Sequence, residues 1–171
     1  MTTEQQTTLI QRAIEAGHEK DDALRIAALC QFDGCEPDEV TLERHDFYGL
    51  SVYSIGNREF AIGTDSEADS ACEQNVSDSL WAFNASFILG ECDLPNSLEE
   101  AIQAWQEKEC EGANEGLLAL VEKTCGLAKF TRAAMSADGR GHFLSSYDGN
   151  ENEVAIETED DDETFYIYRT N

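Results

Sequence analysis

Basic residues are scarce in this sequence, and one long stretch has none. The 171 residues include 11 Lys and Arg against 36 Asp and Glu, which gives a formal net charge of −25. Residues 59–107 hold eleven acids and no base. A surface of this charge repels phosphate groups and anionic lipid, and it attracts basic proteins and cations. We therefore expect the protein to bind neither nucleic acid nor membranes through its own charge.

Export signals and long apolar runs are also missing. Residues 1–11 are rich in Thr and Gln and show neither the basic nor the apolar region of a signal peptide. No apolar run approaches the ~20 residues of a transmembrane helix. The sequence therefore predicts a cytoplasmic protein whose cysteines stay reduced. These are Cys30, Cys35, Cys72, Cys92, Cys110 and Cys125.

Motifs for catalysis, metals and cofactors are absent as well. The chain has no G-x-S-x-G segment and no phosphate-binding P-loop. A zinc site at Cys30, Cys35 and His45 is disfavoured, because structural zinc sites usually show two close pairs of ligands. We expect no cofactor and no metal ion.

One acidic segment partly matches the ligand spacing of a calcium-binding loop. Asp148, Asn150, Asn152 and Glu159 fall at positions 1, 3, 5 and 12 of an EF-hand loop. Position 6 is Glu153, although the sharp turn there requires glycine. The sequence disfavours an EF-hand and leaves open weak divalent binding by the acidic loop.

The N-terminal half shows two kinds of hydrophobic periodicity. Spacings of three and four residues predict helices, and the alternation that follows predicts an antiparallel meander with turns at 48–49 and 56–57. The helices are expected at 3–17 and 22–32, and the strands at 40–46, 50–55 and 58–63.

The middle of the chain reads as helical and the tail as strands. Capping boxes at Thr64 with Glu67 and at Ser97 with Glu100 mark two helix starts. Helices are expected at 65–83, 98–109, 114–124 and 127–136, a strand through 142–147, and a hairpin of strands around 154–156 and 165–169 with 157–163 as its loop. The expected fold is one α+β domain, 1–171, with N-terminal helices, a three-strand antiparallel meander, a helical middle and a C-terminal β-hairpin. Residues 1–37 could form a helical extension of it.

Segment 138–142 is the most unusual stretch. Arg140 could hold an anion, and His142 could act as an acid or base oriented by Asp138 or Asp148. The same Asp-Gly and Arg-Gly pairs are also ordinary turn chemistry. We favour the turn, because no nucleophile, metal triad or phosphate loop accompanies the histidine.

The acids of the 65–83 helix form the main candidate site. Asp65, Asp69, Glu73 and Asp78 are spaced at four, four and five, close to one helical stripe, and no base within the helix neutralises them. We expect this uncompensated face to contact a protein partner. Asp160, Asp161 and Asp162 of the tail loop are expected to assist.

Four segments stand out by their sequence: 79–87 (SLWAFNASF), 110–114 (CEGAN), 137–149 (ADGRGHFLSSYDG) and 165–169 (FYIYR). With these segments the chain resembles a group of small acidic proteins of bacteriophages and mobile elements. The group has no established activity, so the resemblance implies a phage origin and action in the host cytoplasm, and it supplies no catalytic residue.

Three functions remain in view. The leading hypothesis is an acidic protein-binding module, a DNA mimic that inhibits a basic host nucleic-acid-binding or defence protein. The alternatives are a small enzyme with a site around His142 and a soluble protein adapted to a salty cytoplasm. Only four of the eleven bases are Lys, which is compatible with the last.

Overall fold

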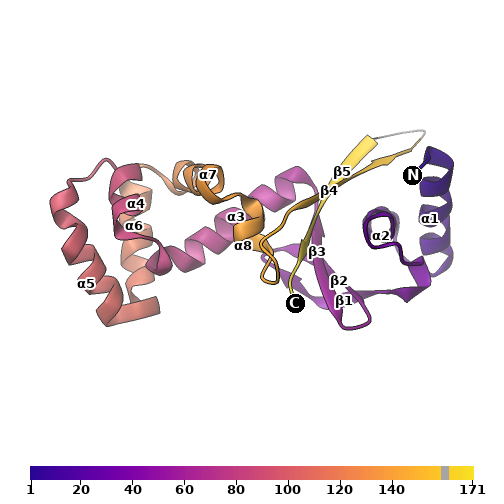
Figure 1. The fold of residues 1–171 in the computed structure, drawn as a ribbon, viewed down its shortest axis with the longest axis horizontal. Coiled ribbons are helices and arrows are strands. Elements are labelled where there is room, and N and C mark those ends of the chain that lie inside the picture. The colour runs from indigo at the N-terminus through magenta and orange to yellow at the C-terminus, as the bar shows by residue number, and fades with distance from the viewer. Residues whose placement is uncertain (159–161) are drawn as a thin grey trace. The chain divides into compact units, whose positions relative to one another are not determined.

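The computed structural model describes residues 1–158 and 162–171. The chain divides into two compact units. The first, here called the sheet unit, comprises 1–71 and 140–171; the second, the helical unit, comprises 72–139. The elements of both are labelled in Figure 1.

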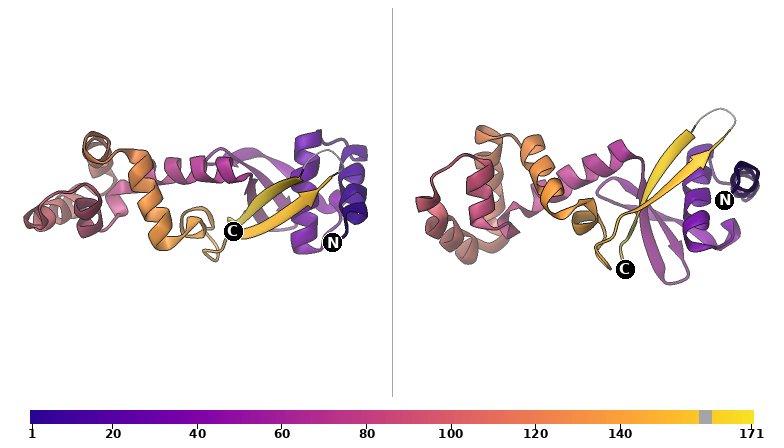
Figure 2. Two further views of the ribbon diagram at one scale, coloured as in Figure 1. Left: turned by 90° about the horizontal axis from the view of Figure 1, so that it is seen from above. Right: turned by 45° about the horizontal axis from the view of Figure 1, so that its top comes forward.

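The described strands of the sheet unit form one antiparallel sheet in the order β1-β2-β3-β5-β4. The strands are β1 (Val40–Phe47), β2 (Leu50–Ile55), β3 (Arg58–Gly63), β4 (Asn152–Glu157) and β5 (Asp162–Arg169). The predicted meander is confirmed, and its turns contain the expected left-handed residues: φ is 53° at Tyr48, 85° at Gly49 and 60° at Gly56. The expected C-terminal hairpin is present as β4 and β5, which Figure 2 shows side by side.

Two helices cover one face of this sheet, as Figures 1 and 2 show: α1 (Thr3–Glu15) and α2 (Lys20–Asp33). Alternate strand residues point toward them because side chains alternate between the two faces of a strand. Tyr53 is paired with Phe60, and Ile62 with Ile167, and all four side chains lie in one core with α2. Residues 1–33 are therefore integral to the core of the sheet unit.

The remaining strand positions turn to the other face, where Leu50, Val52, Ala61 and Tyr168 are buried. The sheet unit also contains the first residues of α3 (Asp65–Ser79) and the short α8 (Arg140–Leu144).

The strand expected through 142–147 is wrong, because Arg140–Leu144 is helical. Gly141 and Leu144, three residues apart, are buried, and the Ser145 N–H donates to the Gly141 carbonyl at 2.9 Å. The buried residues of this segment are therefore spaced as on one face of a helix, and not in the alternation of a strand.

The helical unit contains the rest of α3 and further helices, and its fully buried side chains include Leu80, Ile88, Leu89, Val121 and Phe130. These elements are η2 (Leu80–Ala82), α4 (Ala85–Glu91), η3 (Asn96–Leu98), α5 (Glu99–Glu109), η4 (Cys110–Ala113), α6 (Asn114–Thr124) and α7 (Leu127–Asp138). The rings of Phe83 and Phe87 each lie 5.3 Å from that of Phe130.

The predicted helices of the middle are present, with three differences. The helix expected at 65–83 ends at Ser79 and gives way to a 3₁₀ turn. Helix α4, which Asn84 caps by accepting from the Ser86 N–H at 2.9 Å, was not predicted. The capping box at Ser97 is wrong, because a 3₁₀ turn precedes α5 and no side chain caps it.

Candidate functional site

Helix α3 begins as its sequence predicts. The Thr64 N–H donates to Glu67 Oε2 at 2.7 Å, and the Glu67 N–H donates to Thr64 Oγ1 at 3.4 Å, which completes the capping box. Glu67 also accepts from Arg25 of α2 at 2.8 Å. Burial opposes ionisation of Glu67, but the Thr64 N–H and Arg25 outweigh it, so the pKa of Glu67 lies below its usual value.

The expected row of uncompensated charge on α3 needs correction. Arg140, 75 residues further along the chain, places Nη1 at 2.8 Å from Asp65 and 3.0 Å from Asp69. Both carboxylates therefore have a basic partner that does not come from their own helix. Sequence reasoning missed it because nothing local to α3 reveals a residue brought in by the fold. Glu73 is half-buried, and the exposed Asp78 accepts from Gln74 at 3.0 Å.

Arg140 is the most heavily engaged base in the sheet unit. Its Nε and Nη2 donate to the two carboxylate oxygens of Glu151 at 2.7 and 3.1 Å, and its guanidinium lies 4.2 Å from the centre of the Tyr166 ring. Desolvation opposes the charge, but Glu151 and Asp65 outweigh it and raise the pKa of Arg140. The anions that Arg140 holds in this structure are thus this protein's own carboxylates.

Several other arginines also form ion pairs with carboxylates. Arg12 pairs with Glu36 and Asp38, Arg25 with Glu67, and Arg58 with Asp33. Arg25 and Arg140 are shielded, with side chains only 14% and 13% exposed, whereas their partners Glu67 and Asp65 are 44% and 69% exposed. In these two pairs the fold covers the positive member and leaves the negative member in solvent.

The predicted acidic loop is described only in part. Asp160 and Asp161 lie outside the described residues, as does Glu159 of the weighed calcium loop. Asp162 is the exposed first residue of β5, where it is paired with Glu157 of β4. The expected assistance of these acids to the α3 contact therefore stays a prediction.

His142 lies on the exposed side of α8, and its ring meets that of Phe143 edge-on at 5.0 Å. In the described part of the chain, no hydrogen bond or ion pair reaches His142. Asp148, its candidate orienting acid, instead accepts from Ser145 Oγ at 2.8 Å and the Asn150 N–H at 3.0 Å. The Asn150 N–H and the Ser145 hydroxyl lower the pKa of Asp148.

The three candidate zinc ligands lie in two separate places. Cys30 and Cys35 meet at the end of α2, whereas His45 is exposed on β1, with Nε2 3.9 Å from Glu59. Within residues 1–158 and 162–171, no group of three or more His, Cys, Asp and Glu side chains could hold a metal ion.

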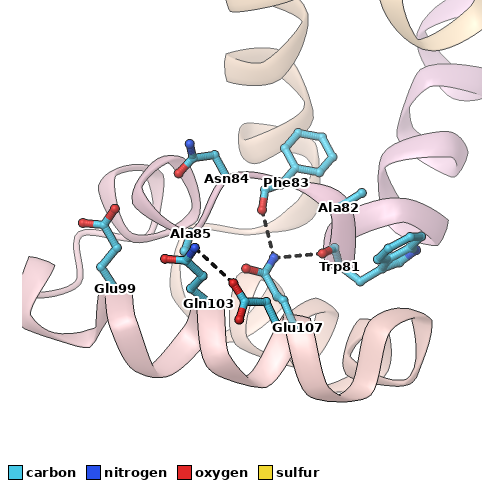
Figure 3. A pocket seen from close by; sticks show the side chains of 9 residues that line it. Trp81, Ala82, Phe83, Asn84, Ala85, Glu99, Gln103 and Glu107 are labelled. Carbon is cyan, nitrogen blue, oxygen red and sulfur yellow. Dashed lines mark hydrogen bonds between the residues drawn. The ribbon is translucent and has the colours of Figure 1, made fainter.

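A hollow of about 460 Å³ opens in the helical unit between the turn after α3 and one side of α5 (Figure 3). Gln106 Nε2 donates to the carbonyl oxygens of Trp81 and Phe83 at 3.0 and 2.8 Å, and Gln103 Nε2 donates to Glu107 at 3.3 Å. Glu99 and Glu107 give the lining two carboxylates. Such a lining can accept hydrogen bonds from a cationic group, for instance a lysine or arginine side chain.

Comparisons with known proteins add no assignment: no protein-family model, curated protein or solved structure matches the chain. Among the described residues, no helix combines the length and apolar character that crossing a bilayer requires.

Proposed function

We propose that this protein is an acidic binding module that attaches by charge to a basic protein. The observation that carries the proposal is the asymmetry of the ion pairs at the start of α3, in which Arg25 and Arg140 are shielded while the carboxylates of Glu67, Asp65 and Asp69 remain 44%, 69% and 54% exposed. The Arg58–Asp33 pair, away from α3, has the opposite asymmetry. A partner approaching this surface meets carboxylates rather than guanidinium groups. Electrostatic steering would then speed association.

The proposed contact lies on α3. Because Arg140 engages Asp65 and Asp69, we assign the larger share of the contact to Glu73 and Asp78. Glu73 and Asp78 are five residues apart, which places them about 7.5 Å apart along the helix axis. One strand of DNA carries one phosphate per about 3.4 Å. A protein groove that binds DNA would therefore meet, along this helix, roughly half of the charge density of one DNA strand. We extend the proposal to a nucleic-acid-binding or defence protein of a phage host, in whose cytoplasm the protein would act.

The experiment compares two charge-matched variants. Glu73→Gln with Asp78→Asn removes two charges from α3, and Glu99→Gln with Glu107→Gln removes two from the hollow beside α5. A partner retained from host cytosol at low salt is purified, and its association with each variant is measured against salt concentration. The α3 variant should associate about three- to tenfold more slowly, with a shallower salt dependence, while the α5 variant stays close to the parent.

The other outcomes are equally informative. An equal loss in both variants would show that net charge governs binding and that α3 is not the contact. A loss confined to the α5 variant would move the contact to the hollow. Unchanged binding in both would contradict these carboxylates as the binding groups.

DNA mimicry has its own test. Duplex DNA should displace the partner from this protein, and the protein alone should give no mobility shift with DNA or RNA at modest salt. A partner that binds DNA and this protein together would exclude mimicry without excluding a charge-driven contact.

A further inference from the structure

The end of helix α2 brings two cysteines together. Gly34 adopts a left-handed conformation, φ 78°, and its N–H donates to the Cys30 carbonyl at 2.8 Å. In this type of helix ending, the residue after the glycine folds back over the last turn and contacts the residue whose carbonyl is bonded. Those two residues here are Cys35 and Cys30, and their Sγ atoms lie 3.1 Å apart.

The two thiols differ in access. Cys30 is 2% exposed within the core between α2 and the sheet, whereas Cys35 is half-buried at its edge. A reagent in solution can therefore reach Cys35 first. Cys30 is buried, but its Sγ atom is in contact with that of Cys35. Closing the gap to the about 2.05 Å of a disulfide requires a movement of roughly 1 Å, which falls on the short segment 31–34.

We propose that Cys30 and Cys35 form a reversible intramolecular disulfide by exchange with a low-molecular-weight disulfide. This modification is independent of the proposed charge-driven binding. It is compatible with reduced cysteines in the cytoplasm, where disulfides are usually transient and redox-sensing.

The exchange takes two steps. The Cys35 thiolate attacks one sulfur of oxidised glutathione, forming a mixed disulfide and releasing the first glutathione thiolate. The Cys30 thiolate then attacks Cys35 Sγ, which forms the Cys30–Cys35 bond and releases the second glutathione. Two protein thiols are oxidised and one glutathione disulfide is reduced. The two thiol protons end on the two molecules of reduced glutathione.

The surroundings favour Cys35 as the attacking group. Its hydrogen bond with Cys30 lowers the pKa of Cys35, although burial and the nearby Asp33 oppose this. Arg58, which pairs with Asp33, also interacts electrostatically with Cys35. Cys30 shows the opposite shift, because its hydrogen bond with Cys35 and its burial raise its pKa.

The chain offers two internal comparisons. Cys110 is exposed, so it reports whether the oxidant is active. Cys92 and Cys125, at the ends of α4 and α6, lie 3.6 Å apart, so they report on a looser thiol pair.

The test treats the folded full-length protein with oxidised and reduced glutathione at set ratios, then alkylates free thiols and digests with trypsin. Cleavage after Arg25 and Arg44 leaves both Cys30 and Cys35 in one peptide, 26–44, so the disulfide appears as a closed loop within it. We expect this peptide to lose both alkylation sites as oxidant rises and to regain both when reductant is restored. The Cys30→Ser variant should accumulate glutathione on Cys35, and Cys35→Ser should react at least about tenfold more slowly at Cys30.

Two results would overturn the proposal. One is a peptide 26–44 that keeps two free thiols while Cys110 becomes glutathionylated. The other is a lasting mixed disulfide on Cys35 in the parent protein, because Cys30 would then fail to resolve it. Both readouts come from the parent protein, so neither depends on whether the serine variants fold.

Discussion

At the scale of single residues, Gly141 is packed directly against the backbone of another segment. A Cβ atom there would lie 2.3 Å from the Gly149 carbonyl oxygen and 2.8 Å from backbone atoms of Asn150 and Glu151. These backbone atoms cannot move away as the end of a flexible side chain can. Helix α8 can therefore pack this closely against the turn only if residue 141 is glycine. The same turn carries Glu151, the bidentate partner of Arg140.

We therefore expect Gly141→Ala to lower the free energy of unfolding by at least about 2 kcal/mol, as overpacking of a tight contact does. Urea denaturation of parent and variant would measure it. The matched control is Gly90→Ala in α4, where no atom lies within 4 Å of the added Cβ. It should raise stability by up to about 1 kcal/mol, because alanine favours helix. Equal stability of Gly141→Ala and the parent would show that this close approach is absent.

The two glycines flanking Arg140 also show what sequence can reveal about a residue. An Asp-Gly pair predicts a backbone turn, and Gly139 does have a left-handed φ of 79°. Gly141 is required for a different reason, the space between two segments. That reason depends on a tertiary contact, so local sequence could not show it.

At the scale of elements, Glu67 fixes the start of α3 to α2 through Thr64 and Arg25. Its folded pKa is lowered, so its contribution to stability is complete above its unfolded pKa, about 4.3, and is lost as pH falls through the folded value.

Glu67→Gln should therefore lose less stability than the parent between about pH 5 and pH 3. At pH 7 the variant should be less stable by under about 1 kcal/mol, because this carboxylate is partly exposed and screened by solvent. Denaturation series at several pH values would measure both effects. Glu100→Gln, an exposed acid of α5 with no hydrogen bond in the described structure, should follow the parent curve. A Glu67→Gln curve parallel to the parent's would contradict the assigned role.

Elements in which the hydrophobic pattern repeats several times could be predicted from the sequence, and the shortest helices could not. The meander was placed to within a residue because strong alternation is bounded by glycine turns at 49 and 56. Helix α8 is five residues long, too short to show a helical period, and its sequence predicts a strand instead. The ion pairs of Arg140 and the thiol pair at the end of α2 were missed for a related reason, since each depends on how chain segments fold back on one another.

For the whole molecule, a net charge of −25 implies self-repulsion within the folded state. Added KCl should raise the melting temperature, with most of the gain reached by ~0.5 M, where screening acts over only a few ångströms. The Glu73→Gln and Asp78→Asn variant should start higher at low salt and gain less. A melting temperature that climbs steeply into molar KCl would instead favour adaptation to a salty cytoplasm.

The path of the chain through its two units has a consequence for synthesis. The sheet unit is interrupted after residue 71 and resumes at 140, so the helical unit is an insertion within it. Strand β3 pairs with β5, and Phe60 lies opposite Arg169. A ribosome must therefore deliver the chain as far as Arg169 before this ladder can close. Until then β3 presents an open edge, which exposes the nascent chain to misassociation.

The residues where the chain leaves and re-enters the sheet unit are held together, since Arg140 bonds to Asp65 and Asp69. When the two ends of an inserted segment lie close together, the segment can be exchanged or shortened without disturbing the domain that contains it. From this geometry we expect the 68 residues between them to be removable, with a short linker from 71 to 140 that leaves every strand pairing of the sheet intact.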